Sequence, residues 1–258
     1  MPSRPWYTRV RPPNGWVDAF LQIGMWFAAY YLYRLVRGVV DGQVTESFAH
    51  ARGVVNFERA IGTFFEPGLQ SWASQHAQWL IDAANICYVN MHLFGTTTFL
   101  VWLYFARNDA FYFVRNMFMV AMGIALIGYV VFPTAPPRFM PEWGFTDTVT
   151  NMVGSEPANT ANILYNPYAA VPSMHVAFAL MIGFAGAKLM GRRLLKAAFC
   201  AYPLWVTFVT VVTANHFWID AALGAVAAAA AYSLAVAAAR TRPHAWAFRR
   251  ALASEAPA

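Results

Sequence analysis

The chain has 258 residues, of which 59% are hydrophobic and 12% are charged, and its formal net charge is +6. Soluble domains carry about 25% charged residues, so this composition excludes an ordinary soluble domain and indicates a membrane protein. The basic residues are dispersed over several short segments rather than gathered on one face, which argues against a nucleic-acid partner.

Several apolar stretches are long enough to cross a bilayer, for which about 20 residues suffice. In chain order they are Val17–Val36, Trp79–Phe105, Phe111–Phe132, Val171–Met190, Ala197–Thr213 and Phe217–Ala239. No small-residue cleavage site follows the first stretch, so it is interpreted as a retained span rather than a signal peptide. The pattern predicts an all-α, polytopic membrane helical bundle of about six transmembrane helices, forming a single domain over residues 1–258. The oligomeric state is left open.

Arginine and lysine near the span ends predict the orientation, because cytoplasmic flanks hold most of the positive charge. In a six-span arrangement most of these residues, including Arg4, Arg107 and Arg192, fall on the side of both termini. We therefore expect an integral protein of the plasma membrane, surrounded by membrane lipids, with both termini in the cytoplasm.

The connection Gln43–Gln78 carries apolar residues at helical spacing among charges, as an interfacial amphipathic helix does. Pro67 and Gly68 are expected to break this helix. The pattern fits two alternatives equally well. The helix either packs on the outer end of the bundle or collects lipid substrate at the membrane surface.

Polar residues interrupt the second apolar stretch, where the spacing places Asn85, Tyr88 and His92 along one helix face. We expect these side chains to bind a headgroup or an acceptor, with interhelical hydrogen bonding as the alternative. The later connection Pro133–Tyr168 is rich in Pro, Gly, Asn and Thr. A connection of this length is typical of a functional loop, so a lid or substrate-contacting loop is expected.

Two histidines lie where apolar stretches meet a loop. His175 follows Pro172 and Ser173, and Pro172 is expected in the first turn of a helix, where free backbone N–H groups form an anion site. His216 precedes Asp220 by four positions, so the carboxylate can hold the imidazole on one helix face. A short turn between the fourth and fifth spans is expected to bring both histidines to one membrane face.

Pro172-Ser173-Met174-His175 and His216-Phe217-Trp218-Ile219-Asp220 resemble the second and third motifs of the type 2 phosphatidic acid phosphatase superfamily, usually Pro-Ser-Gly-His and His-x-x-x-Asp. This family consists of integral membrane lipid-phosphate phosphatases and phosphotransferases. The resemblance implies a catalytic core over residues 133–223, with motif-bearing helices at 171–190 and 197–239.

The chain departs from the family pattern in its cations. The first motif, Lys-x6-Arg-Pro, is represented only by Arg138, with Val131 in place of the lysine and Phe139 in place of the proline. Val209 and Thr210 stand where the third motif has Ser-Arg. These departures resemble the branch that includes inositol phosphorylceramide synthases and sphingomyelin synthases, in which a phospho-headgroup passes to a lipid hydroxyl.

The resemblance also implies residue roles. His216 attacks phosphorus, Asp220 orients it and His175 protonates the leaving oxygen, with no cofactor and no metal. Arg138 and Ser173 are the implied substrate-binding residues. The expected activity is hydrolysis of a lipid phosphate through a phosphohistidine at the outer membrane interface. The alternative is a phosphotransferase that moves a headgroup such as phosphoinositol from a phospholipid to a lipid or polyol hydroxyl.

Two other classes of protein are weighed against these enzymes. A membrane transporter would also place polar residues within spans, but it predicts broken helices or inverted repeats around a midplane site. A zinc enzyme could use His175, His216 and Asp220 as ligands, but no His-Glu-x-x-His or comparable cluster accompanies them.

Overall fold

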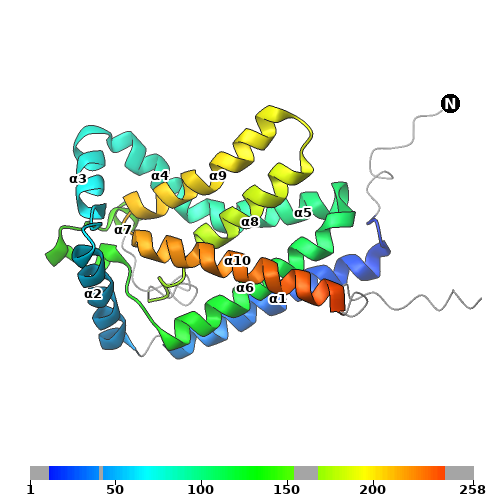
Figure 1. The fold of residues 1–258 in the computed structure, drawn as a ribbon, viewed down its shortest axis with the longest axis horizontal. Helices are drawn as coiled ribbons and strands as arrows, with labels where there is room; N and C mark the ends of the chain where they lie inside the picture. Colours follow the sequence, from blue (N-terminus) through cyan, green and yellow to red (C-terminus); the bar gives the residue numbers. More distant parts are fainter. Residues whose placement is uncertain (1–11, 41–42, 154–167, 242–258) are drawn as a thin grey trace, which may run out of the picture.

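A computed structural model of the protein describes residues 12–40, 43–153 and 168–241 (Figure 1). Within these ranges every regular element is a helix, and the only strand-like pairing is an isolated parallel bridge between Thr134 and Ala169. The prediction of an all-α membrane bundle is confirmed.

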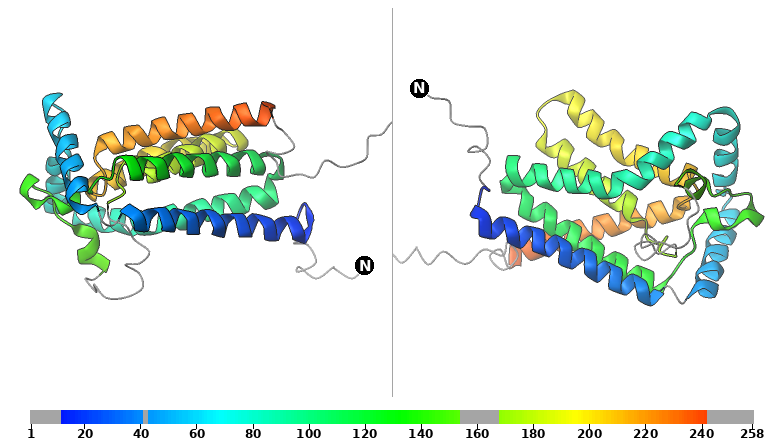
Figure 2. Two further views of the ribbon diagram at one scale, coloured as in Figure 1. Left: turned by 90° about the horizontal axis from the view of Figure 1, so that it is seen from below. Right: turned by 180° about the vertical axis from the view of Figure 1, so that it is seen from behind.

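The long helices run alongside one another and form the bundle (Figure 2). They are α1 (Gly15–Val40), α4 (Gln78–Asn90), α5 (Thr96–Ala106), α6 (Asn108–Val131), α8 (Met174–Leu189), α9 (Arg193–Val212) and α10 (Trp218–Thr241). The remaining elements gather at one end of the bundle (Figure 1). They are α2 (Val44–Ala60), α3 (Glu66–His76), the 3-10 helices η3 (Pro137–Phe139) and η4 (Pro141–Trp143), and α7 (Thr148–Val153).

Three helices in the described part of the chain, α6, α9 and α10, are long and apolar enough to cross a membrane. A fourth candidate is formed by α4 and α5 together, which meet at 53° across the π-helical segment Met91–Gly95. The helix α8 is apolar but has only 16 residues, and α1 is not among the candidates. The expected number of six spans therefore stays a prediction.

A polar network joins α1 to the rest of the bundle. The carboxylate Oδ2 of Asp18 accepts hydrogen bonds from the hydroxyl groups of Tyr104 and Tyr112, each at 2.8 Å. One turn later, Arg115 donates to the side-chain oxygen of Gln22. Polar side chains within a bundle are satisfied by such interhelical bonds, so Asp18 and Gln22 connect α1 to α5 and α6.

Small residues bring α8 close to α9. A Cβ atom at Gly186 would lie 2.2 Å from the ring of Phe199, and one at Gly183 would lie 2.7 Å from the backbone oxygen of the same residue. Glycine at these positions therefore permits the close helix pairing that is common in membrane bundles. The pairing fixes the start of α8 relative to the end of α9, which is where the two histidines lie.

The amphipathic segment Gln43–Gln78 contains two helices rather than one, and the position predicted for its break was wrong. The chain leaves helical geometry after Ala60, and Gly62 adopts a φ of 72°, a left-handed conformation that glycine adopts without strain. Pro67 lies in the first turn of α3, where a missing N–H costs no helical hydrogen bond.

Candidate active site

The turn 213–217 between α9 and α10 carries His216. It reverses tightly, because the N–H groups of both Asn215 and His216 donate to the Thr210 oxygen, at 3.0 and 3.1 Å. Ala214 has a φ of 53°, which is a left-handed conformation unusual for a residue with a Cβ. Such strained positions persist only where surrounding contacts enforce them, so the geometry of this turn is tightly determined.

Asp220 holds His216 from the first turn of α10. Its Oδ2 atom accepts a hydrogen bond from the Phe217 N–H at 2.9 Å and faces the Nδ1 atom of His216 at 3.4 Å. The second contact is longer than an ordinary hydrogen bond. Both side chains are buried, with 5% of His216 and none of Asp220 exposed. With Nδ1 turned to the carboxylate, Nε2 is the nitrogen left for chemistry.

The structure brings the two motif histidines together. The ring centroids of His175 and His216 lie 5.6 Å apart at an interplanar angle of 61°. His175 also stacks on the ring of Tyr88, with a centroid distance of 4.5 Å and an interplanar angle of 24°. Tyr88 therefore belongs to this cluster through an aromatic contact with His175.

Ser173 is the N-cap of α8, so the helix starts later than the sequence pattern suggested. The helix begins at Met174, and Pro172 lies before the cap rather than in the first turn, because the backbone of Ser173 is extended. The Ser173 hydroxyl accepts from the Val176 N–H at 3.5 Å, and its own N–H donates to the Asp220 carbonyl oxygen at 3.0 Å. These bonds tie the two motifs to each other.

Arg138 lies beside the turn that carries His216. Its N–H donates to the Ala214 oxygen at 2.8 Å, and its Nη1 donates to the side-chain oxygen of Asn215. Its Nε atom lies 3.8 Å from Oδ2 of Asp147, and only 2% of the side chain is exposed. The guanidinium group is thus held next to the turn that carries His216.

The side chain of Asn85 forms hydrogen bonds with the loop and does not point freely into the site. Its side-chain nitrogen donates to the Thr148 carbonyl oxygen and its side-chain oxygen accepts from the Thr148 hydroxyl, both at 3.1 Å. It therefore holds the start of α7 against α4. The side chain of His92 lies outside the part of the structure that is described, so its predicted role and that of Asn85 in headgroup binding stay predictions.

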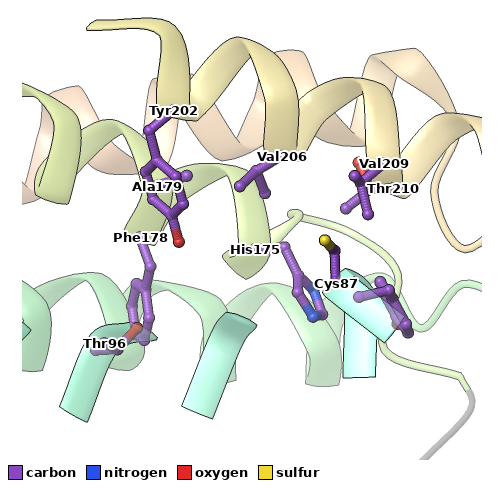
Figure 3. Close-up of a pocket in the computed structure, with 10 residues that line it drawn as sticks. Cys87, Thr96, His175, Phe178, Ala179, Tyr202, Val206, Val209 and Thr210 are labelled. Atoms are coloured by element: carbon purple, nitrogen blue, oxygen red, sulfur yellow. The ribbon is translucent and has the colours of Figure 1, made fainter. Parts of the chain in front are cut away.

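A narrow pocket runs from His175 into the bundle between α4, α5, α8 and α9 (Figure 3). Tyr88 and Cys87 line it beside His175, and Thr96 and Tyr202 line it further along. Most of its remaining lining is apolar, from Phe178, Ala179, Val206 and Val209. The histidine cluster therefore adjoins a narrow, mostly apolar pocket.

Two acidic residues belong to the same region, and the sequence pattern did not single them out. Glu66 accepts from the Trp218 N–H at 3.0 Å, and Glu58 accepts from the Ile219 N–H at 3.3 Å. The indole of Trp218 also donates to the Thr63 hydroxyl at 3.2 Å, in the turn between α2 and α3. The interfacial helices thus contact the start of α10, directly after His216.

Burial and the neighbouring Glu66 carboxyl raise the pKa of Glu58 to about 9. The other carboxyl oxygen of each residue, Oε2, is buried and has no hydrogen-bond partner among the described residues. Within the ranges that the structure describes, no group of three or more His, Cys, Asp or Glu side chains could hold a metal ion.

Comparison with known protein families gives one finding for this chain. A family model described as the PAP2 superfamily matches residues 52–234, which is more than half of the chain. The matched range contains both histidines, Asp220, Arg138 and the two buried glutamates. Comparisons with curated proteins and with solved structures give no match.

Proposed function

Because the chain belongs to the PAP2 superfamily, we propose that it hydrolyses a lipid phosphate through a phosphohistidine, without a metal ion. Membership of this superfamily supports a phosphatase-type activity in general. The observation that carries the specific proposal is the pair of imidazoles 5.6 Å apart, of which one is held by a buried carboxylate. One imidazole attacks and the other transfers the proton.

In the first step, Nε2 of His216 attacks phosphorus and the bond between phosphorus and the lipid oxygen breaks. Asp220 stabilises the positive charge that develops on the attacking imidazole, since its Oδ2 faces Nδ1 at 3.4 Å. His175 gives its proton to the lipid oxygen. In the second step His175 takes a proton from water, the oxygen attacks phosphorus, and phosphate leaves Nε2.

Phosphoryl transfer depends on charge stabilisation around the phosphoryl oxygens. Arg138 supplies a guanidinium group beside the nucleophile turn, and the N-terminus of α8, capped by Ser173, supplies the positive end of a helix dipole. We assign both to phosphate binding.

Headgroup transfer is the second candidate function, and a specific feature favours it. Val131 and Phe139 replace the lysine and proline of the first motif, and Val209 and Thr210 replace the Ser-Arg of the third. Fewer cations beside the phosphoryl group fit a phosphodiester headgroup, which carries less charge than a phosphomonoester. An acceptor hydroxyl would then replace water in the second step, as in the inositol phosphorylceramide synthase-like branch. A transporter is not favoured, because the histidines gather at helix ends.

The orientation proposed for the chain follows from its charges. Both termini are placed in the cytoplasm of a plasma-membrane protein, and the histidine cluster on the opposite side. The structure is compatible with this arrangement, since α1 begins and α10 ends at one end of the bundle, away from α2, α3 and α7 (Figure 1).

The experiment that tests the proposed function is a phosphate-release assay on detergent-purified protein in EDTA, with a panel of lipid phosphates. His216→Ala is expected to lower kcat by about a thousandfold or more, because it removes the attacking atom. His76→Ala is the matched control, since His76 lies at the end of α3 in an exposed position. It should leave kcat unchanged.

Each outcome of this assay has a defined meaning. Release that needs no acceptor and vanishes in His216→Ala supports the phosphatase. Product that forms only when an acceptor hydroxyl is added supports the transferase. An unaffected kcat in His216→Ala, or activity that disappears in EDTA and returns with a metal ion, would overturn the proposed mechanism.

A further inference from the structure

We infer that Glu58 and Glu66 are positioning residues for His216: by holding the N–H groups of Ile219 and Trp218, they fix the start of α10 and with it the nucleophile. The inference rests on the proposed function for its kinetic consequence. Its structural content, a carboxyl clamp on the first turn of α10, stands apart from any activity.

The clamp consists of three successive backbone donors with three different carboxyl acceptors. The Phe217 N–H donates to Asp220, the Trp218 N–H to Glu66, and the Ile219 N–H to Glu58. The first N–H groups of a helix have no acceptor within it and need one from elsewhere. In α10, Asp220 of the same helix supplies one acceptor, and α2 and α3 supply the other two through Glu58 and Glu66.

The two glutamates are buried, which distinguishes this arrangement from a helix cap formed by surface side chains. Both side chains are 0% exposed, and they come from different helices, α2 and α3. Carboxyl groups are almost never fully buried unless they are paired. Here each accepts a backbone N–H of α10 through its Oε1 atom. Both buried carboxyl groups therefore depend on the start of α10 for these hydrogen bonds.

The clamp acts on His216 through Asp220. The Oδ2 atom of Asp220 both accepts the Phe217 N–H and faces Nδ1 of His216. A shift of Trp218 and Ile219 moves the backbone on which Asp220 sits, and so changes the 3.4 Å contact that orients the imidazole. A displacement of about 1 Å in a reacting group can cost about a hundredfold in rate. Glu58 and Glu66 are therefore expected to matter for kcat rather than for substrate affinity.

The same arrangement bears on where the substrate phosphate can bind. The positive end of a helix dipole attracts anions, but at α10 protein carboxyl groups already occupy it. The start of α8 is capped by a neutral hydroxyl, that of Ser173. An anionic substrate is thus directed to α8 and Arg138 rather than to α10.

The experiment compares Glu66→Gln with Glu66→Met in the full-length, detergent-purified protein. Glutamine keeps an oxygen that can accept the Trp218 N–H and a group that can bond to Glu58, whereas methionine keeps the length and loses the acceptor. Glu142→Gln is the matched control, because Glu142 is an exposed acid of η4. Hydrogen exchange at residues 217–219, kcat, KM and the thermal midpoint are measured for each variant.

Glu66→Met is expected to lower kcat by about tenfold to a hundredfold with KM within about twofold of the wild type. It should also speed exchange at residues 217–219 by about tenfold or more, while exchange in the later turns of α10 stays unchanged. Glu66→Gln should keep kcat within about threefold. A kcat restored by glutamine but not by methionine identifies the acceptor as the cause, which a general loss of stability would not produce.

Two results would overturn the inference. One is unchanged exchange at residues 217–219 in Glu66→Met, and the other is an equal loss of kcat in the glutamine and methionine variants. If the wild type shows no turnover of any lipid phosphate, the proposed function fails, and the exchange measurement still decides whether the clamp exists. The two failures are therefore distinguishable.

Discussion

Glu58 shows how strongly one buried side chain can couple proton binding to folding. Its pKa is raised to about 9 in the folded protein because the carboxyl is buried beside Glu66, whereas the ordinary value is 4.5. Between these two values the folded state holds a proton that the unfolded state has released. The free energy of unfolding therefore decreases as pH rises through this window, and the contribution is complete only below the lower value.

This coupling predicts a pH-dependent thermal midpoint in detergent. The midpoint of the wild type should fall as pH is raised from about 6 to about 9, and Glu58→Gln should reduce that fall because glutamine has no proton to lose. Other groups contribute to the slope, so the difference between the two proteins is the quantity to measure. Equal slopes in the wild type and Glu58→Gln would contradict the assignment, and Glu142→Gln should follow the wild type.

At this scale the sequence was informative where residues are close together in the chain. His216 and Asp220 stand four positions apart, and their contact was predicted from that spacing, although His216 lies in the turn before α10 rather than on the helix with Asp220. The bond between Glu58 and Ile219 joins residues 161 positions apart, and an acid in an amphipathic segment is ordinarily solvated. Nothing local distinguishes Glu58 from a surface residue, so its role could not be predicted.

At the scale of elements, Gly224 of α10 lies against the start of α8. A Cβ atom there would lie 2.4 Å from the carbonyl oxygen of Ser173, a backbone atom that cannot swing aside. A Cβ atom at Gly128 of α6 would likewise lie 2.7 Å from the Cδ atom of Pro172. The loop before α8 is thus enclosed by glycines on two neighbouring helices, and this enclosure sets the position of His175.

Gly224→Ala is therefore expected to destabilise the protein by about 1–3 kcal/mol, as overpacking of a well-packed site does. Because the clash is with Ser173, it should also displace His175 and lower kcat. The matched control is Gly123→Ala in α6, where a Cβ would meet nothing within 4 Å and alanine favours the helix. Thermal midpoints and phosphate release report the two effects. Equal behaviour of the two variants would show that the close approach does not matter.

The helices were largely predictable, because apolar stretches of the required length have few alternatives. The expected stretch Phe111–Phe132 corresponds to α6, and Phe217–Ala239 corresponds to α10. The errors lie where backbone details decide. The segment Gln43–Gln78 breaks near Gly62 instead of at Pro67, since a proline in a first helical turn is tolerated while a left-handed φ ends a helix.

At the scale of the whole molecule, the functional groups lie at one end of the bundle. The interfacial helices α2 and α3 and the short helix α7 occupy that end (Figure 1). In the orientation proposed from the charge pattern, this end lies outside the cytoplasm. The number of six spans stays a prediction, because α8 is apolar but has only 16 residues.

The orientation can be tested by cysteine labelling in intact cells. With Cys87 and Cys200 replaced by alanine, a cysteine at exposed Glu142 should react with a membrane-impermeant reagent, because η4 lies at the proposed outer end. A cysteine at exposed Arg192, between α8 and α9, should react only after permeabilisation. The opposite pattern would reverse the proposed orientation.

The clamp on α10 also has a consequence for how the chain is made. Glu58 and Glu66 leave the ribosome early, whereas their donors, Ile219 and Trp218, are synthesised 161 and 152 residues later. Until α10 is made, both acids lack these partners. In a nascent chain that stops before α10, α2 and α3 can still bond to earlier segments, as Ser47 does to Ala135 and Gln70 to Thr146. The synthesis of α10 supplies the backbone donors of the two glutamates and the turn of His216 together, so the docking of these acids is completed in the same step as the candidate active site.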